Sequence, residues 1–219
     1  MSSTCCGVSN VFDDAKARED LESYRRKGPS DSTVQLIDAL RERAPTLDTL
    51  LDIGGGVGAI AHELLANGVM HATLVDGSAS YLDAAREEGA HRSTNVRLEL
   101  RKGDIVAIAA DVGPADVVTL DKVVCCYEDM DALLAVSAER ARRLYGIVYP
   151  RDDWWVRLFI AAENAVRRLK GNDFRGFVHA NSAIDAALRR AGLTPRFNAR
   201  GAWWIVAVYE RVGASPSST

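Results

Sequence analysis

The sequence predicts an α/β protein with five parallel strands, a C-terminal antiparallel hairpin that extends the sheet, and helices on both faces. Two observations predict this architecture. Between residues 50 and 149, short apolar segments alternate with amphipathic ones, as expected for parallel strands joined by crossover helices. Near the C-terminus, only Arg200-Gly201 separates two strand-like segments, and so short a connection permits only antiparallel pairing.

Length and composition predict a single domain. The chain has 219 residues, of which 47% are hydrophobic and 26% charged, and these values are ordinary for one globular domain with a substantial core. We expect residues 1–11 and 213–219 to be disordered ends, because both are small and polar. The domain then spans 12–212, with N-terminal helices in 12–47 and an inserted lid helix in 151–180.

Net charge and cysteine spacing limit which partners and metals we expect the protein to bind. The net charge of −3 gives no general attraction to nucleic acid. No apolar run approaches the roughly 18 residues needed to span a bilayer, and no signal peptide is evident. The four cysteines form two adjacent pairs, a spacing that does not predict a metal site. We therefore expect a cytoplasmic monomer or homodimer with a small-molecule partner and no nucleic acid, membrane or metal.

The elements follow in order along the chain. Two N-terminal helices are predicted, one over Phe12–Tyr24 and one that starts near Ser30 after Pro29. Further helices are expected from near Val57 onward, over Tyr81–Glu88 with Gly89 as the stop, over Met130–Arg142 and over Ser182–Ala191. The strands are expected at 50–53, 71–75, 96–100, 115–120, 144–149, 194–199 and 202–211.

The segment between Pro150 and Ala180 departs from this alternation. Its apolar side chains share one helical stripe: Trp155, Leu158, Phe159, Ala162, Val166 and Leu169. This pattern predicts an inserted helix that lies over the sheet edge and serves as a lid.

A glycine turn after the first strand predicts a nucleotide cofactor. Asp52 precedes Gly54, Gly55, Gly56 and Gly58, and glycines permit positive φ and close approach of a ligand to the helix N-terminus. Gly54, Gly56 and Ala59 also satisfy the dinucleotide pattern GxGxxA, so this loop alone leaves NAD open. However, Asp52 favours a positively charged ligand group over a pyrophosphate, and the terminal hairpin is foreign to dinucleotide-binding sheets.

Three further strand ends carry polar residues at the same edge of the predicted sheet. They are Asp76-Gly77-Ser78, Gly103-Asp104-Ile105 and Asp121-Lys122, and ligands bind at this edge in open parallel sheets. Asp76 lies 18 residues after Gly58, close to the offset of about 20 at which an acid reaches a ribose. Asp104 either accepts from an adenine amine, with Ile105 on the ring, or is only a turn acid.

These motifs resemble those of class I S-adenosylmethionine-dependent methyltransferases. The segments 51–58, 74–76, 103–105 and 118–121 stand in that family's order and spacing. The resemblance implies a Rossmann-like sheet, S-adenosylmethionine as cofactor and S-adenosylhomocysteine as product. It also implies a cofactor shell composed of Asp52, Gly54, Gly55, Gly56, Gly58, Asp76, Gly77, Ser78, Asp104, Ile105 and Asp121.

A weaker resemblance connects residues 121–127, 174–179 and Tyr24 to magnesium-protoporphyrin O-methyltransferases. In that family a histidine stands where Cys125 or Cys126 stands here, and a tyrosine beside it is thought to assist. Tyr24 is its nearest counterpart. The absence of the histidine puts a porphyrin substrate in doubt.

The acceptor side is predicted from residues that follow the fourth and fifth strands. Arg151 or Arg175 can hold a carboxylate in a two-pronged contact, and Trp154 and Tyr127 offer aromatic surface. Histidine is the side chain best suited to act as a general base near neutral pH, so His179, together with Tyr24, is a candidate catalytic residue. Solvated arginines, packing tryptophans and a helix-capping histidine are the alternative interpretations.

We expect a small-molecule methyltransferase that acts on oxygen. A cofactor-binding module without turnover is one alternative. A nicotinamide-dependent oxidoreductase is the other.

Overall fold

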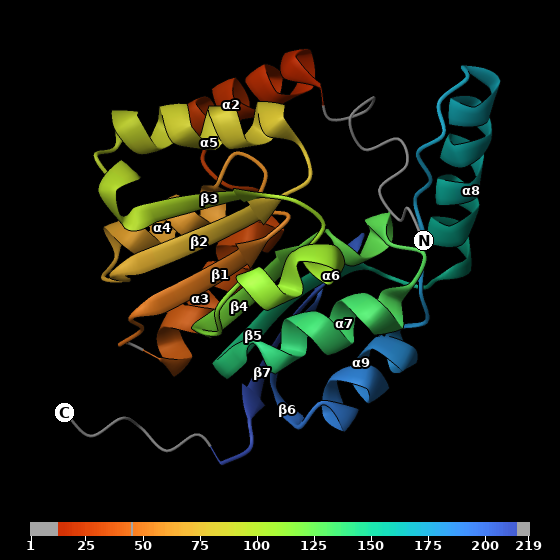
Figure 1. Cartoon of the computed structure of the whole chain (residues 1–219). Helices are drawn as coiled ribbons and strands as arrows, with labels where there is room; N and C mark the ends of the chain where they lie inside the picture. Colours follow the sequence, from red (N-terminus) through yellow and green to blue (C-terminus); the bar gives the residue numbers. More distant parts are fainter. Residues whose placement is uncertain (1–12, 45, 214–219) are drawn as a thin grey trace.

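The computed structural model describes residues 13–44 and 46–213 as one seven-stranded sheet with helices on both faces (Figure 1). The predictions for 1–11 and 214–219 lie outside the described residues. The helices are α2 (Asp14–Lys27), α3 (Asp31–Arg43), α4 (Ala59–Ala66), α5 (Ala79–His91), α6 (Ile105–Ile108), α7 (Met130–Glu139), α8 (Trp154–Leu169) and α9 (Asn181–Arg190). The strands are β1 (Thr49–Ile53), β2 (His71–Asp76), β3 (Leu98–Lys102), β4 (Ala115–Asp121), β5 (Ala141–Pro150), β6 (Leu193–Arg200) and β7 (Trp204–Arg211).

The strand order is β3-β2-β1-β4-β5-β7-β6. β1 to β5 pair in parallel, whereas β7 pairs antiparallel with both β5 and β6. The predicted parallel sheet with a terminal hairpin is therefore confirmed. Because the order reverses between β1 and β4, the carboxyl ends of these two central strands flank the crevice where such sheets bind ligands.

Successive residues of β1 serve opposite faces of the sheet, because strand side chains alternate. Leu50 packs with Leu36 of α3 and Leu64 of α4 on one face. Leu51 packs with Leu133 of α7 and Leu188 of α9 on the other. Both faces are thus covered, which explains why β1 and β4 are almost wholly apolar up to their acidic ends.

Three expectations about helices are wrong. α7 ends at Glu139 rather than at Arg142, because Ala141 already pairs with Ala115 of β4 as the first residue of β5. α5 continues through Gly89 to His91, because the positive φ typical of a helix end is adopted by Ser93 and not by Gly89. α8 forms as predicted, but its apolar stripe does not cover the sheet, and Val156 is its only buried residue. The side of α8 that contacts the protein carries Val156, Ile160 and Asn164 instead.

Candidate functional site

The carboxyl ends of β1 to β4 surround a cavity of about 460 Å³. Its lining includes most of the predicted cofactor shell: Asp52, Gly54, Gly55, Gly56, Asp76, Gly77, Ile105 and Asp121. Gly58, Ser78 and Asp104 lie directly behind this lining, where they shape the turn and cap helices. The structure therefore brings together residues from four separate strand ends, as the topology requires.

The glycine turn is tightly packed against the cavity wall. Gly54 and Gly56 adopt φ values of +63° and +56°, which side chains rarely tolerate. A Cβ on Gly55 would lie 2.5 Å from Oδ2 of Asp52, and one on Gly54 would lie 2.6 Å from a methyl group of Val123. These positions leave no room for a side chain, so the turn presents bare backbone to a ligand.

Asp76 clamps the glycine turn onto the end of β2. Its Oδ2 accepts the N–H of Gly56 at 3.0 Å, and its Oδ1 accepts the N–H of Ser78 at 2.8 Å. Burial raises the pKa of Asp76, while these two N–H bonds act in the opposite direction. Each carboxylate oxygen accepts more than one hydrogen bond, so the clamp can still receive two hydroxyl groups from the cavity.

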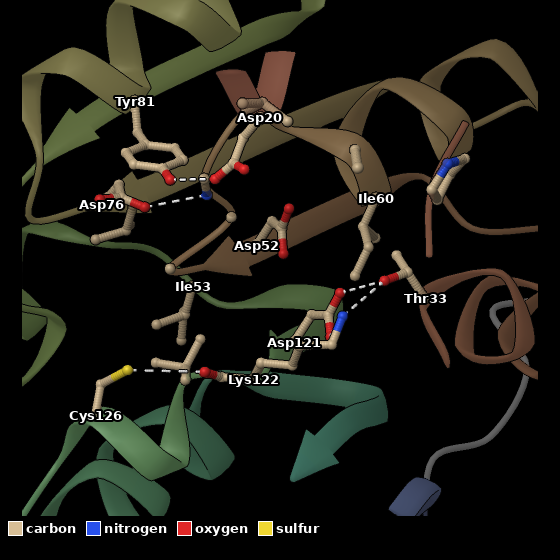
Figure 2. Close-up of a pocket in the computed structure, with 18 of the residues that line it drawn as sticks. Asp20, Thr33, Asp52, Ile53, Ile60, Asp76, Tyr81, Asp121, Lys122 and Cys126 are labelled. Carbon is tan, nitrogen blue, oxygen red and sulfur yellow. Dashed lines mark hydrogen bonds and ion pairs between the residues drawn. The ribbon is translucent and has the colours of Figure 1, made fainter. Parts of the chain in front are cut away.

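Asp52 is completely buried at the centre of the cavity wall (Figure 2). Its Oδ1 accepts the hydroxyl of Thr119 at 2.7 Å, but within the described residues Oδ2 has no hydrogen-bond partner. Burial raises the pKa of Asp52 to about 7, and the charges of Asp121 and Asp76 add to this effect. A buried carboxylate oxygen without a partner is costly, and a cationic ligand group fits that position.

The N-terminal helices form a roof over the cavity. Asp20, Ser23 and Tyr24 of α2 line it, and Asp20 accepts the hydroxyl of Tyr81 from α5 (Figure 2). Outside the cavity, Arg25 donates to Glu88 of α5 at 2.7 Å. The roof is therefore held to the Rossmann-like core by polar contacts.

Lys122 lines the cavity beside Asp121; the sequence places this pair at the end of a predicted strand but assigns no role to Lys122. It adopts φ +61°, an unusual backbone conformation that clusters at functional sites. Its Nζ donates to Ser30 Oγ at 2.8 Å and lies 3.4 Å from Asp121 Oδ1. Asp121 Oδ2 accepts the hydroxyl of Thr33 at 2.6 Å, as Figure 2 shows. This network joins the end of β4 to the start of α3.

No local signal identifies Thr33, Asp20 or Tyr81 as site residues, or predicts the contact of Lys122 with Ser30. Their contacts cross 61 to 92 positions of sequence, and α2 itself is only weakly amphipathic. For Lys122, the sequence signal was its position beside Asp121 at the end of a predicted strand.

Two of the predicted acceptor-side residues, Tyr24 and Tyr127, line the cavity. The Tyr24 hydroxyl donates to Glu63 at 2.9 Å, and the Tyr127 hydroxyl donates to Asp104 at 2.7 Å. Asp104 also accepts the N–H of Val106 and caps α6. Its predicted contact with adenine stays a prediction.

The other four predicted acceptor-side residues do not line the cavity. His179 bonds through Nε2 to the carbonyl of Tyr127 at 2.8 Å. Arg151 pairs with Asp153, Arg175 donates to the Asn172 carbonyl, and Trp154 is 76% exposed. The physical reason is that the chain leaves the sheet after β5 and forms α8 away from the cavity, which α2 covers instead.

Across 13–44 and 46–213, no group of three or more His, Cys, Asp and Glu side chains is arranged to hold a metal ion. None of the helices in this part of the chain combines the length and apolar character that crossing a bilayer requires.

Comparison with known proteins supports the resemblance to methyltransferases that the motifs indicated. Residues 50–144 match the family model described as a methyltransferase domain. This match, over 95 of the 219 residues, agrees with that resemblance. The chain has no significant match among curated proteins.

Solved structures confirm the fold. The magnesium protoporphyrin IX methyltransferase of Synechocystis with bound S-adenosylhomocysteine is 15% identical, with a TM-score of 0.68, and the match covers 93% of this chain and 99% of that one. An O-methyltransferase family protein from Burkholderia thailandensis is 18% identical with a TM-score of 0.73, over 93% of this chain and 62% of that longer one. A TehB-like methyltransferase from Corynebacterium glutamicum is 18% identical with a TM-score of 0.62, over 91% of this chain and all of that one.

Proposed function

We propose that this protein is a cytoplasmic enzyme that transfers the methyl group of S-adenosylmethionine to an oxygen atom of a small molecule. The observation that carries the proposal is that Asp52 and Asp76 face one cavity from either side of a side-chain-free glycine turn. One acid has an unpartnered buried oxygen and the other has spare acceptor capacity. A ligand with a cationic group and a vicinal diol satisfies both.

Different residues of the chain bind different parts of the cofactor. Asp76 accepts the two ribose hydroxyls while its N–H contacts keep its orientation fixed. Asp52 accepts from the amino group of the methionine part, which provides the partner that Oδ2 lacks. Gly103 and Ile105 form the wall beside the adenine. When bound, the cofactor supplies an electrophilic methyl group on a sulfonium sulfur.

The acceptor end of the cavity lies between β4 and the roof. Lys122 and Thr33 provide one cation and one hydroxyl group there, which suits a polar oxygen acceptor. Binding of the acceptor beside the methyl group accelerates transfer by proximity and orientation. The cavity of about 460 Å³ limits the acceptor to a small molecule under the closed roof.

We further propose roles for the remaining predicted site residues. Tyr24 contributes its ring to the cavity, and burial raises the pKa of its hydroxyl, so it acts as a neutral donor. His179, Arg151, Arg175 and Trp154 contact only an acceptor that extends beyond the cavity toward 151–180.

Two measurements test the proposed function. Isothermal titration with S-adenosylhomocysteine tests the cofactor, and absence of binding at millimolar ligand would refute it. NADH fluorescence on mixing serves as the control for a dinucleotide site. A panel of phenols, carboxylic acids and amines with S-adenosylmethionine then tests the acceptor. Formation of S-adenosylhomocysteine with oxygen acceptors is expected, whereas turnover of amines alone would overturn O-methylation.

A further inference from the structure

The α8 helix exposes a continuous apolar face. At 3.6 residues per turn, eight apolar residues fall on an arc of about 140°: Trp154, Trp155, Leu158, Phe159, Ala162, Ala165, Val166 and Leu169. We call these residues the α8 face. Leu169 is 88% exposed and Leu158 is 63% exposed. Contiguous exposed apolar surface of this kind marks an interaction site.

The opposite side of α8 is fixed to the protein, so the α8 face does not turn inward. The Asn164 side chain exchanges two 2.8 Å hydrogen bonds with the backbone of Gly176. The Arg167 guanidinium lies 5.2 Å from the ring centre of Phe174. Figure 1 shows the consequence: α8 stands at the side of the molecule, away from the layers that cover the sheet.

Trp203 of the β6–β7 turn extends the patch. Its ring lies 4.6 Å from the ring of Trp155 and 5.0 Å from that of Phe159, centre to centre. Trp203 is itself exposed. Aromatic side chains therefore gather at the end of α8 that is nearest the sheet, and tryptophan favours the boundary between water and lipid.

Basic residues border the α8 face. Arg157 and Arg168 lie along one border, and Lys170 follows at the other. The only acid within the helix is Glu163, which pairs with Arg167 at 3.2 Å. Because the whole chain carries a net charge of −3, this basic border is a local feature and favours an anionic partner.

The same charges disfavour a second copy of the chain as the occupant. In a two-fold antiparallel pairing of α8, each border of one copy lies opposite the same border of the other copy. Arg157 of one copy would then lie beside Arg168 of the other, and like charges at that spacing repel.

We propose that the α8 face docks onto the surface of an anionic lipid bilayer. An amphipathic helix with aromatic and aliphatic residues on one side and a basic border lies in the headgroup region without crossing it. This mode is compatible with the finding on membrane-spanning helices, since α8 lies on the lipid rather than across it. α8 directly follows β5, so docking brings the cavity-bearing edge of the sheet next to the membrane. The inference does not depend on methyl transfer.

Vesicle flotation tests the proposal. The full-length protein is mixed with vesicles of phosphatidylcholine and phosphatidylglycerol at 7:3, or of phosphatidylcholine alone. We expect binding to the anionic vesicles that is at least tenfold tighter than to the neutral ones and that falls at high salt. The Leu158→Asp/Leu169→Asp variant should lose at least tenfold in affinity. Val212→Asp is the matched control, because Val212 is exposed on the far end of β7, and its binding should match wild type.

Three outcomes would overturn the proposal. They are equal binding to both vesicle types, unchanged binding of the Leu158→Asp/Leu169→Asp variant, and a dimer by light scattering that this variant converts to a monomer. Leu158 and Leu169 make no core contacts, so the variant retains its fold, which circular dichroism checks.

Discussion

Replacement of Asp52 by Asn tests the central electrostatic argument of the site. Burial raises the pKa of Asp52 from 3.8 to about 7, so between pH 4 and 7 the folded protein binds more protons than the unfolded chain. Stability therefore falls as the pH rises through this window. At 1.36 kcal/mol per pKa unit, the ionised carboxylate costs the ligand-free protein about 4 kcal/mol above pH 7.

Asn removes that cost and keeps the bond from Thr119, but it places an unpaired N–H where Oδ2 lies, at about 1–3 kcal/mol. We expect Asp52→Asn to be more stable than wild type by about 1–3 kcal/mol at pH 8 and to lose the part of the fall in stability between pH 5 and 7 that Asp52 causes. We also expect its affinity for S-adenosylhomocysteine to fall at least tenfold, because the cationic amino group loses its anionic partner.

Urea unfolding at pH 5 and pH 8 measures the first effect, and isothermal titration at pH 8 measures the second. Asp83→Asn is the control, since Asp83 is a surface acid paired with Arg86, and it should change neither quantity appreciably. A variant that is less stable than wild type at pH 8, or that binds the ligand as tightly, would refute the reasoning.

Three further predictions concern the same cavity. Asp76→Ala removes the acceptor of two N–H bonds and the proposed ribose contact, so S-adenosylhomocysteine affinity should fall at least 100-fold, and an unchanged Kd by titration calorimetry would exclude the ribose role. Gly55→Ala forces a methyl group against Asp52 and should cost about 1–3 kcal/mol of unfolding free energy, whereas Gly113→Ala, with open space around it, should cost less than about 1 kcal/mol in the same urea titration. Tyr24→Phe loses the bond to Glu63 and should lower stability by about 1 kcal/mol while turnover falls less than tenfold. A loss of turnover above 100-fold with S-adenosylhomocysteine affinity intact would instead make Tyr24 catalytic.

The cofactor side was predictable because its signals are local. Asp52, Asp76 and the glycines each sit at the end of a strand, and parallel topology alone carries them to one edge of the sheet. The alternation of elements and the short Arg200-Gly201 connection predicted the parallel strands and the terminal hairpin, whereas the order of the strands in the sheet came only from the structure.

The roof and the acceptor end were not predictable by the same route. Tyr81 meets Asp20, and Lys122 meets Ser30, only after distant segments pack together. The α8 stripe shows a related limit: helical periodicity reveals which side is apolar but not what covers it.

The roof has a consequence for the timing of the reaction cycle. Tyr24, Arg25 and Asp20 fasten α2 to α4 and α5 by hydrogen bonds that lie across the cavity and beside it. A ligand that needs more room than the cavity of about 460 Å³ therefore has to break these bonds and displace α2. In the proposed methyl transfer, this displacement of α2 would be a step separate from the transfer itself. Its rate would limit turnover whenever it is the slower of the two steps.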